Sequence, residues 1–407
     1  MNKRILVIAF HYPPIQGSTG VHRTASMTRY LPELGWQPVV LTADTRAYPR
    51  IVSNPEADAD NVYRAWGRDT AKSFAIRGWY PRLLTLPDRW QSWAVGGVRT
   101  GRKLIRQFRP DLIYSTYPIA TAHLIGLHLH RTSGLPWIAD FRDPMAQEDY
   151  PVDPLQRKAF FALEKRVVRE ANMCLLTTPG ARDYYRDRYP DRAAKFALWE
   201  NGYDEAAFAA AEQLPTGRSD KLVLLHSGLL YESERNPAHF FEAVAQLKKA
   251  GLLADVEIRL RASGNQAAYQ RELERLAIDD RVLLKDAVPY HQALREMLDA
   301  DGLLIFQAEN CNQQIPAKIY EYFRARRPIF AMTHDDGDTA RLLQTETGAD
   351  IADLESTADI AVKLETFIAD LRAGKSRVTA GTETEKYSRE GRVRQLVQIL
   401  EQVGGAV

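Results

Sequence analysis

Lys318 and Glu321 stand three residues apart, in a segment whose residue types suit the binding of a phosphate and a sugar. This spacing places both side chains on one face of a helix. Lys318 could neutralise a phosphate, and the carboxylate of Glu321 could accept hydrogen bonds from both hydroxyls of a ribose. The alternative is a surface ion pair between the two side chains, which would stabilise the helix by only about 0.2–0.5 kcal/mol.

The residues before Lys318 favour the phosphate interpretation. Pro316 fits the first turn of a helix, because its missing N–H is not needed there. The helix start would then direct unpaired backbone N–H groups and its positive end toward an anion. The segment concerned is Ile315, Pro316 and Ala317.

A second loop of the same half could reach the same anion. Gly228 follows an apolar run and permits close approach of the backbone to a ligand. Arg235 stands seven residues later, where its guanidinium could reach a pyrophosphate. The alternative is a surface arginine near the start of a helix.

The first half has a weaker candidate after its first apolar run. Gly17 and Gly20 would allow a ligand to approach the backbone, and Arg23 would add a positive charge, so a diphosphate could bind there. The dinucleotide fingerprint Gly-x-Gly-x-x-Gly is absent. A plain strand-to-helix turn is therefore the alternative.

Two carboxylates and a guanidinium follow a later apolar run of the first half, at Asp140, Arg142 and Asp143. The acids could bind sugar hydroxyls or position a general base. Arg142 could instead pair with one of the aspartates and hold the loop. His123 could line a binding cleft on the side opposite the phosphate-binding residues. A lone histidine on a helix is, however, also typical of a core or surface group.

Residues 64–110 hold eleven Lys or Arg against two Asp, a charge of +9 in a chain whose formal charge is +2. Four of the seven tryptophans lie there as well. Basic and aromatic residues together suit the headgroup region of an anionic membrane, and the residues expected at this surface are Trp79, Arg82, Trp90 and Trp93. The alternative is a solvated helical face whose aromatic residues belong to the core.

Composition narrows the class of protein. A chain of 407 residues with 45% hydrophobic and 26% charged residues predicts two globular domains. Cys174 and Cys311 are the only cysteines, so we expect a reducing, cytoplasmic location. No apolar run reaches the roughly 18 residues of a membrane span. We expect no metal, no other cofactor and no nucleic-acid partner, because the corresponding motifs are absent.

Apolar strands alternate with amphipathic helices twice along the chain, which predicts an α/β fold of two Rossmann-like domains with parallel sheets. The expected parts are an acceptor domain over residues 1–200, a linker over 201–220, a donor domain over 221–386 and a C-terminal helix over 387–407 that packs back on the first domain. Ligands bind at the carboxyl ends of parallel strands, which is where the candidate residues stand.

Taken together, these motifs resemble glycosyltransferase family 4, a retaining family of the GT-B type, in the branch common in bacterial exopolysaccharide and lipopolysaccharide biosynthesis. The resemblance covers nearly the whole chain. It rests on six segments: Tyr12 to Arg23, Pro87-Asp88 before Trp93, Asp140 to Pro144, Asn201 to Asp204, Gly228 to Pro237, and Ile315 to Tyr322 with Pro328-Ile329.

The resemblance implies two domains that face each other across a cleft, and metal-independent transfer of a sugar from a UDP- or GDP-sugar to a lipid-linked saccharide. The enzyme would act at the inner leaflet of the inner membrane, as a peripherally bound cytoplasmic protein. Arg235 and Lys318 would stabilise the leaving diphosphate, with His123 and Asp143 also in catalytic roles. The family pairs two glutamates with seven residues between them, but the corresponding position before Glu321 is Gln313, which can donate to a sugar hydroxyl without carrying charge. Alternatives are a sugar-nucleotide epimerase of the same fold and a non-catalytic assembly partner.

Overall fold

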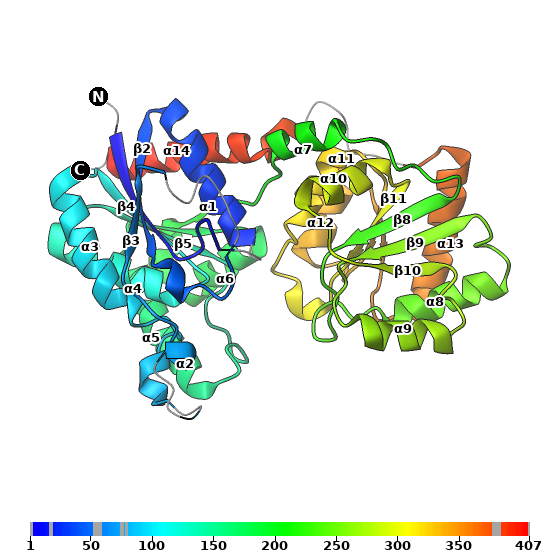
Figure 1. Cartoon of the computed structure of the whole chain (residues 1–407), viewed down its shortest axis with the longest axis horizontal. Coiled ribbons are helices and arrows are strands. Elements are labelled where there is room, and N and C mark those ends of the chain that lie inside the picture. The colour runs from blue at the N-terminus through cyan, green and yellow to red at the C-terminus, as the bar shows by residue number, and fades with distance from the viewer. Residues whose placement is uncertain are drawn as a thin grey trace. The chain divides into compact units, whose positions relative to one another are not determined.

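The computed structural model describes residues 3–15, 19–51, 59–73, 77, 80–376 and 384–405. The chain divides into two compact units, the first formed by residues 1–201 with 389–407 and the second by residues 202–388 (Figure 1). Each unit is a parallel sheet with helices on both faces. The predicted α/β architecture of two Rossmann-like domains is therefore confirmed.

The first unit contains a seven-stranded sheet in the order β3-β2-β1-β4-β5-β6-β7. Its strands are β1 (Lys3–Ala9), β2 (Trp36–Ala43), β3 (Val62–Ala65), β4 (Leu112–Thr116), β5 (Trp137–Arg142), β6 (Met173–Leu176) and β7 (Phe196–Leu198). Its helices are α1 (Thr19–Tyr30), α2 (Thr70–Ser73), α3 (Trp93–Phe108), α4 (Ala120–Ser133), α5 (Pro154–Glu170), α6 (Pro179–Arg188) and α14 (Arg389–Gly404).

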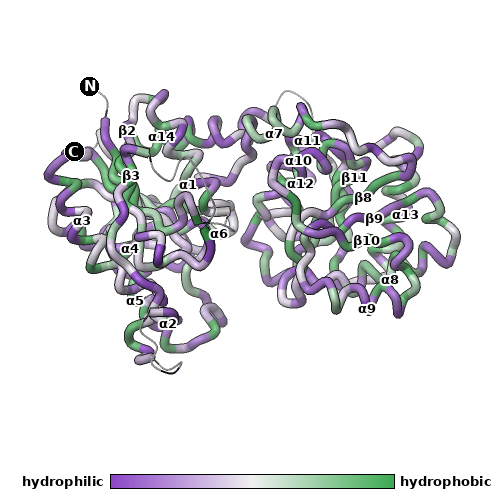
Figure 2. The backbone as a smooth tube through the Cα atoms, viewed as in Figure 1, coloured by the Kyte–Doolittle hydropathy of each residue, from purple (hydrophilic) through white to green (hydrophobic). Residues whose placement is uncertain are grey.

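Alternate residues of each strand serve different faces of the first sheet, because successive side chains of a strand point in opposite directions. Leu6 and Ile8 of β1 face the core under α3, α4, α5 and α6, whereas Ile5 and Val7 face α1 and α14. The central strands are mostly hydrophobic and almost fully buried (Figure 2). This is the pattern of a parallel sheet that is buried on both faces.

The second unit contains a six-stranded sheet in the order β10-β9-β8-β11-β12-β13. Its strands are β8 (Leu222–Ser227), β9 (Val256–Arg261), β10 (Val282–Lys285), β11 (Gly302–Phe306), β12 (Ile329–Met332) and β13 (Asp350–Ala352). Its helices are α7 (Glu205–Glu212), α8 (Ala238–Lys249), α9 (Gln266–Arg275), α10 (Tyr290–Asp299), α11 (Lys318–Ala325), α12 (Asp338–Glu346) and α13 (Thr357–Ala373).

The C-terminal helix α14 packs on the first unit, as the sequence predicted. It lies beside α1, and its apolar residues join the core beneath that helix. Trp199 donates from Nε1 to the carbonyl of Arg392 at 2.8 Å, and Trp36 donates to Glu401 at 3.0 Å. These bonds attach α14 to β2 and to the residue that follows β7.

Part of the segment expected to be a linker is helical. Helix α7 begins after Asp204, whose side chain accepts a hydrogen bond from the backbone of Ala207. Its apolar face, with Phe208 fully buried, packs against the second unit. The alanine-rich sequence of α7 favours a helix, and the glycine and proline that indicated a linker come only after it.

Trp93 belongs to the core and the partly buried Trp90 packs against it, so their assignment to a membrane surface is wrong. Trp93 has no exposed surface, and the ring of Trp90 lies 4.9 Å from that of Phe10 while its Nε1 donates to the carbonyl of Ala47. Helix α3 approaches α4 closely because two glycines face it. A Cβ at Gly97 would lie 2.4 Å from a carbon of the α4 side chain opposite.

None of the helices within the described ranges is long and apolar enough to span a membrane.

Candidate functional site

The order in which the strands are added to the second sheet reverses at β8 and β11. These two parallel strands are neighbours in the sheet although they are far apart in sequence. Ligands of open parallel sheets bind outside the carboxyl ends of the strands at such a point. The loop after β8 contains Gly228 and Arg235, and the loop after β11 leads to Lys318 at the start of α11. The fold therefore brings the two predicted donor segments to one edge of the sheet.

Lys318 and the buried His226 are in direct contact at this edge. The Nδ1 of His226 lies 2.9 Å from the carbonyl of Leu304, and a carbonyl can only accept, so Nδ1 carries the proton. The bare Nε2 then accepts a hydrogen bond from the Lys318 ammonium at 3.2 Å. Burial, and then the charge of Lys318, lower the pKa of His226 well below its usual value. The histidine therefore stays neutral and holds the lysine in place.

Gly228 leaves space for the same ammonium group. Its φ is +132°, a conformation that favours glycine, and its N–H donates to the carbonyl of Arg261 at 2.9 Å. A Cβ at this position would lie 2.7 Å from the Nζ of Lys318. The backbone here can approach a ligand of Lys318 closely only because residue 228 has no side chain.

Arg235 adds a second positive charge near Lys318. Its guanidinium lies 5.2 Å from the ring centre of Tyr231, whose hydroxyl donates to Glu234 at 2.7 Å. Burial and the Arg235 charge lower the pKa of Lys318 to about 7, against the opposing effect of Glu321. Two cations that repel each other in this way form a site that an anion would stabilise.

Glu321 is oriented by a residue that the sequence did not indicate. The hydroxyl of Tyr290, the first residue of α10, donates to Oε1 of Glu321 at 2.6 Å. Glu321 lies one turn after Lys318 on the same helix and is partly exposed. Its second oxygen could accept a hydrogen bond from a ligand hydroxyl.

Helix α11 begins at Lys318, two residues later than Pro316, and has no side-chain cap. The loop before it is held from inside by Gln307, whose Nε2 donates to the carbonyls of Cys311 at 2.7 Å and Gln314 at 2.9 Å. Gln313 lies in the turn of this loop. Ile315 is buried in the core, so only its backbone remains for a ligand, whereas Pro316 and Ala317 are partly exposed.

Arg23 and Asp140 form a buried ion pair in the first unit. The guanidinium contacts both carboxylate oxygens at 3.3 Å, and Asp140 also accepts from Tyr114 at 2.5 Å and Thr116 at 3.0 Å. Arg23 further donates to the carbonyl of Trp199 at 2.6 Å. Internal contacts thus engage both buried groups, which argues against the predicted roles of Arg23 at the donor and Asp140 at the acceptor.

Arg142 and Asp143 remain candidates at the end of β5. Arg142 has a left-handed φ of +67° and donates to the carbonyl of Tyr117 at 3.0 Å, and a Cβ at Gly20 would lie 2.5 Å from its Nη1. The guanidinium thus lies against the first turn of α1. Burial raises the pKa of Asp143, against the opposing charge of Arg142.

His123 lies in the core, so the prediction that it contacts substrate in a catalytic role is wrong. The side chain has no exposed surface, and its Nδ1 lies 2.8 Å from the hydroxyl of Ser115. Burial lowers its pKa to about 4. Its Nε2 is buried without a hydrogen-bond partner among the described residues.

Three further predicted residues stand apart from these clusters. Gly17 and Trp79 lie outside the described residues. Arg82 is exposed and forms an ion pair with Asp153 at the start of α5. Among the residues that the structure describes, no group of three or more His, Cys, Asp or Glu is arranged to hold a metal ion.

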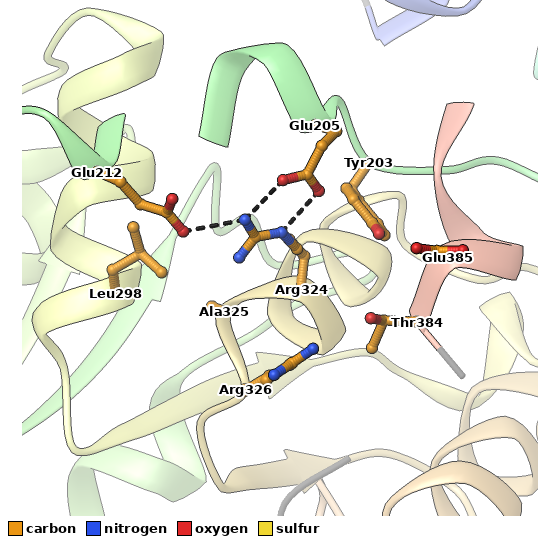
Figure 3. A pocket seen from close by; sticks show the side chains of 9 residues that line it. All are labelled: Tyr203, Glu205, Glu212, Leu298, Arg324, Ala325, Arg326, Thr384 and Glu385. Atoms are coloured by element: carbon orange, nitrogen blue, oxygen red, sulfur yellow. Dashed lines mark hydrogen bonds and ion pairs between the residues drawn. The ribbon is translucent and has the colours of Figure 1, made fainter. Parts of the chain in front are cut away.

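A cavity of about 730 Å³ lies at the other end of α11, beside α7 and the segment from Thr384 (Figure 3). Arg324 points from α11 toward α7, where it contacts Glu205 at 2.6 Å and Glu212 at 2.9 Å. These contacts hold α7 on α11. The cavity is distinct from the Lys318 cluster, since its lining residues come from the far end of the helix.

His226 and Tyr290 are the two residues of this site that the sequence analysis did not identify. His226 is the next-to-last residue of β8, and such a polar side chain in a buried strand near a binding loop is a usable signal. Tyr290 gives no comparable signal, because only the packing of α10 beside α11 brings it to Glu321.

Comparison with known families gives a match for the first unit. Residues 19–202 match the family described as glycosyl transferase 4-like domain. No curated protein matches the chain in sequence.

Solved structures share the fold over the whole chain. The sucrose-phosphate synthase of Thermosynechococcus elongatus has a TM-score of 0.65 at 15% identity, with 100% of both chains covered. Anabaena HepE in complex with UDP has a TM-score of 0.64 at 13% identity, covering 98% of this chain and 100% of that chain. A UDP-N-acetylglucosamine 2-epimerase has a TM-score of 0.56 at 12% identity, covering 100% and 97%.

At these identities the solved structures establish the fold, and the family match covers the first unit. The predicted two-domain GT-B fold is thereby confirmed, and residues 19–202 match a glycosyl transferase 4-like domain, whereas the exopolysaccharide and lipopolysaccharide branch stays a prediction.

Proposed function

We propose that the protein is a glycosyltransferase that moves a sugar, with retention of configuration, from a UDP- or GDP-sugar to a lipid-linked saccharide. The observation that carries the proposal is the cluster of Lys318, Arg235 and the glycine backbone at 228, beside a carboxylate at Glu321. Two cations suit a diphosphate, and the carboxylate suits a ribose. The bound UDP in HepE supports this choice of donor.

In the proposed reaction the bond between the sugar C1 and the diphosphate oxygen breaks, and a bond forms between C1 and the acceptor oxygen on the same face. The diphosphate leaves with an additional negative charge. Lys318, Arg235 and the start of α11 would stabilise this charge in the transition state. The proton of the acceptor hydroxyl would pass to the departing phosphate, so that no metal ion and few protein bases are needed.

Arg142 and Asp143 are the proposed acceptor residues of the first unit. The raised pKa of Asp143 suits a group that hydrogen-bonds a sugar hydroxyl or relays its proton. The acceptor would be a lipid-linked saccharide of cell-surface polysaccharide biosynthesis, which would place the enzyme at the cytoplasmic surface of the inner membrane.

The test is calorimetric titration of the protein with a panel of UDP- and GDP-sugars, repeated with Glu321→Ala. Saturable binding of one donor, weakened at least about tenfold in the variant, is expected because the carboxylate contributes charge-assisted hydrogen bonds. Absence of binding by every donor would contradict the donor site and favour a non-catalytic assembly partner.

A sugar-nucleotide epimerase is the second candidate, since a UDP-N-acetylglucosamine 2-epimerase shares the fold. The two activities differ in their need for an acceptor. Incubating the protein with the bound UDP-sugar alone and following the sugar by NMR distinguishes them. Inversion at a ring carbon without an acceptor would favour the epimerase.

A further inference from the structure

The outer face of α3 carries cations without acidic partners. The exposed cations of this helix are Arg99, Arg102, Lys103 and Arg106. Neither α3 nor α4 contains an Asp or Glu. Within the described part of the chain these four side chains form no ion pair, and Arg102 instead contacts the Nε2 of His128 on α4 at 2.6 Å.

Several exposed arginines elsewhere in the described chain have carboxylate partners. Arg131 contacts Glu170 at 2.6 Å, and Arg275 contacts Glu272 at 2.5 Å. The α3 cations thus differ from these arginines in having no internal counter-charge, so their charge is available to an external anion.

An apolar groove of about 620 Å³ lies beside these cations. It is lined by residues of α3 and α4, two helices that pack against each other (Figure 1). Its apolar lining comes from Ala94, Val95, Val98 and Leu124. Val95 is 72% exposed, a large fraction for a valine on a helix. Arg99, Arg102 and Arg106 line the same groove, so apolar and cationic groups meet on one surface.

We propose that this α3–α4 face binds the anionic phospholipid surface of a membrane, with the arginines against lipid phosphates and Val95 with the groove against the apolar boundary. Basic side chains beside exposed apolar ones match the headgroup region, whereas a nucleic-acid site would not need the apolar part. The inference deepens the proposed function, on which it rests, by naming the surface that would bring the enzyme to a lipid-linked acceptor.

The test is co-sedimentation of the full chain with phosphatidylcholine vesicles that contain or lack phosphatidylglycerol. The variant is Arg99→Glu with Arg102→Glu and Arg106→Glu. The matched control is Lys221→Glu with Lys249→Glu and Arg271→Glu, which makes the same change in net charge at exposed positions of the second unit. The wild type and the control should bind vesicles with phosphatidylglycerol, and the α3 variant should bind them at least about tenfold more weakly.

Two further variants separate the charge effect from other causes. Replacing the three arginines by glutamine keeps the surface polar without adding negative charge, and should also weaken vesicle binding. Val95→Ser should weaken it about two- to fourfold, because it removes an exposed apolar group and no charge. Thermal unfolding midpoints should stay near the wild-type value, since all these positions are exposed.

Three results would overturn the inference: no sedimentation of the wild type with anionic vesicles, equal loss in the α3 variant and the control, or tighter binding of this face to duplex DNA than to vesicles. Titration with UDP distinguishes a failure of the membrane inference from a failure of the proposed donor site. The α3 variant should bind UDP as the wild type does. If the α3 variant loses vesicle binding but still binds UDP, the effect concerns only the membrane surface. If Glu321→Ala loses UDP binding but still binds vesicles, the result supports only the donor site.

Discussion

The two units use the same sheet plan but arrange their buried charges in opposite ways. In the first unit, the charges of Arg23 and Asp140 neutralise each other near the strand ends. Two hydroxyls donate further hydrogen bonds to Asp140, and a backbone carbonyl accepts one from Arg23. In the second unit, Lys318 lies near another cation and donates a hydrogen bond to a neutral histidine. Charged groups near the strand ends therefore neutralise each other in one unit, whereas in the other they repel each other and form the proposed anion site.

The largest effect is expected from breaking the neutralised pair of the first unit. Asp140→Asn keeps the size of the side chain but removes its charge, which leaves the Arg23 guanidinium buried without a counter-ion. The free energy of unfolding should fall by about 3–5 kcal/mol, as is usual when one partner of a buried ion pair is removed. Chemical denaturation followed by circular dichroism measures the change.

The control for this variant is Glu170→Gln, which breaks the pair with Arg131 at the surface. That change should lower the free energy of unfolding by no more than about 1 kcal/mol. A similar small loss in Asp140→Asn would show that the Arg23–Asp140 pair does not hold the first unit together, and would return both residues to the list of ligand-binding candidates.

The second effect concerns Lys318, whose pKa of about 7 lies below that of an unfolded lysine. Between about pH 7 and pH 10.5 the unfolded chain binds more protons than the folded one, so this group makes the protein more stable as the pH rises. UDP should have the opposite dependence, because it binds the charged lysine. Its affinity should fall above about pH 7, by up to about tenfold per pH unit.

Lys318→Met sharpens this prediction. The variant should bind UDP about 10- to 100-fold more weakly near pH 7 and lose the pH dependence, since the charged hydrogen bond is absent. Its free energy of unfolding should change by no more than about 1 kcal/mol, because the substitution also removes repulsion from Arg235. Calorimetric titrations at several pH values test both statements. Unchanged pH dependence in the variant would mean that another group titrates.

Much of the fold follows from sequence patterns that depend on neighbouring residues alone. The apolar runs predicted most strands, and the spacing of Lys318 and Glu321 predicted their shared helix face. The errors arose where contacts join distant residues. Arg23 donates to the carbonyl of Trp199, 176 residues away, and Trp93 packs in the core against Gly67, where a Cβ would lie 2.7 Å from the Cβ of Trp93. No local spacing reveals such contacts, so charge and aromatic content alone indicated exposure for Trp93.

The smallest effect is expected from Tyr290→Phe, which removes one hydrogen bond to Glu321 and leaves the carboxylate in place. If Glu321 holds the ribose, the variant should bind UDP about two- to tenfold more weakly, as one hydrogen bond contributes about 0.5–1.5 kcal/mol. It should also discriminate less between UDP and 2′-deoxy-UDP, because an unoriented carboxylate recognises the hydroxyl less well. Equal loss for both nucleotides would instead assign Tyr290 a purely structural role between α10 and α11. Competition calorimetry with the two nucleotides decides between these outcomes, with Glu321→Ala as the reference for complete loss of the carboxylate.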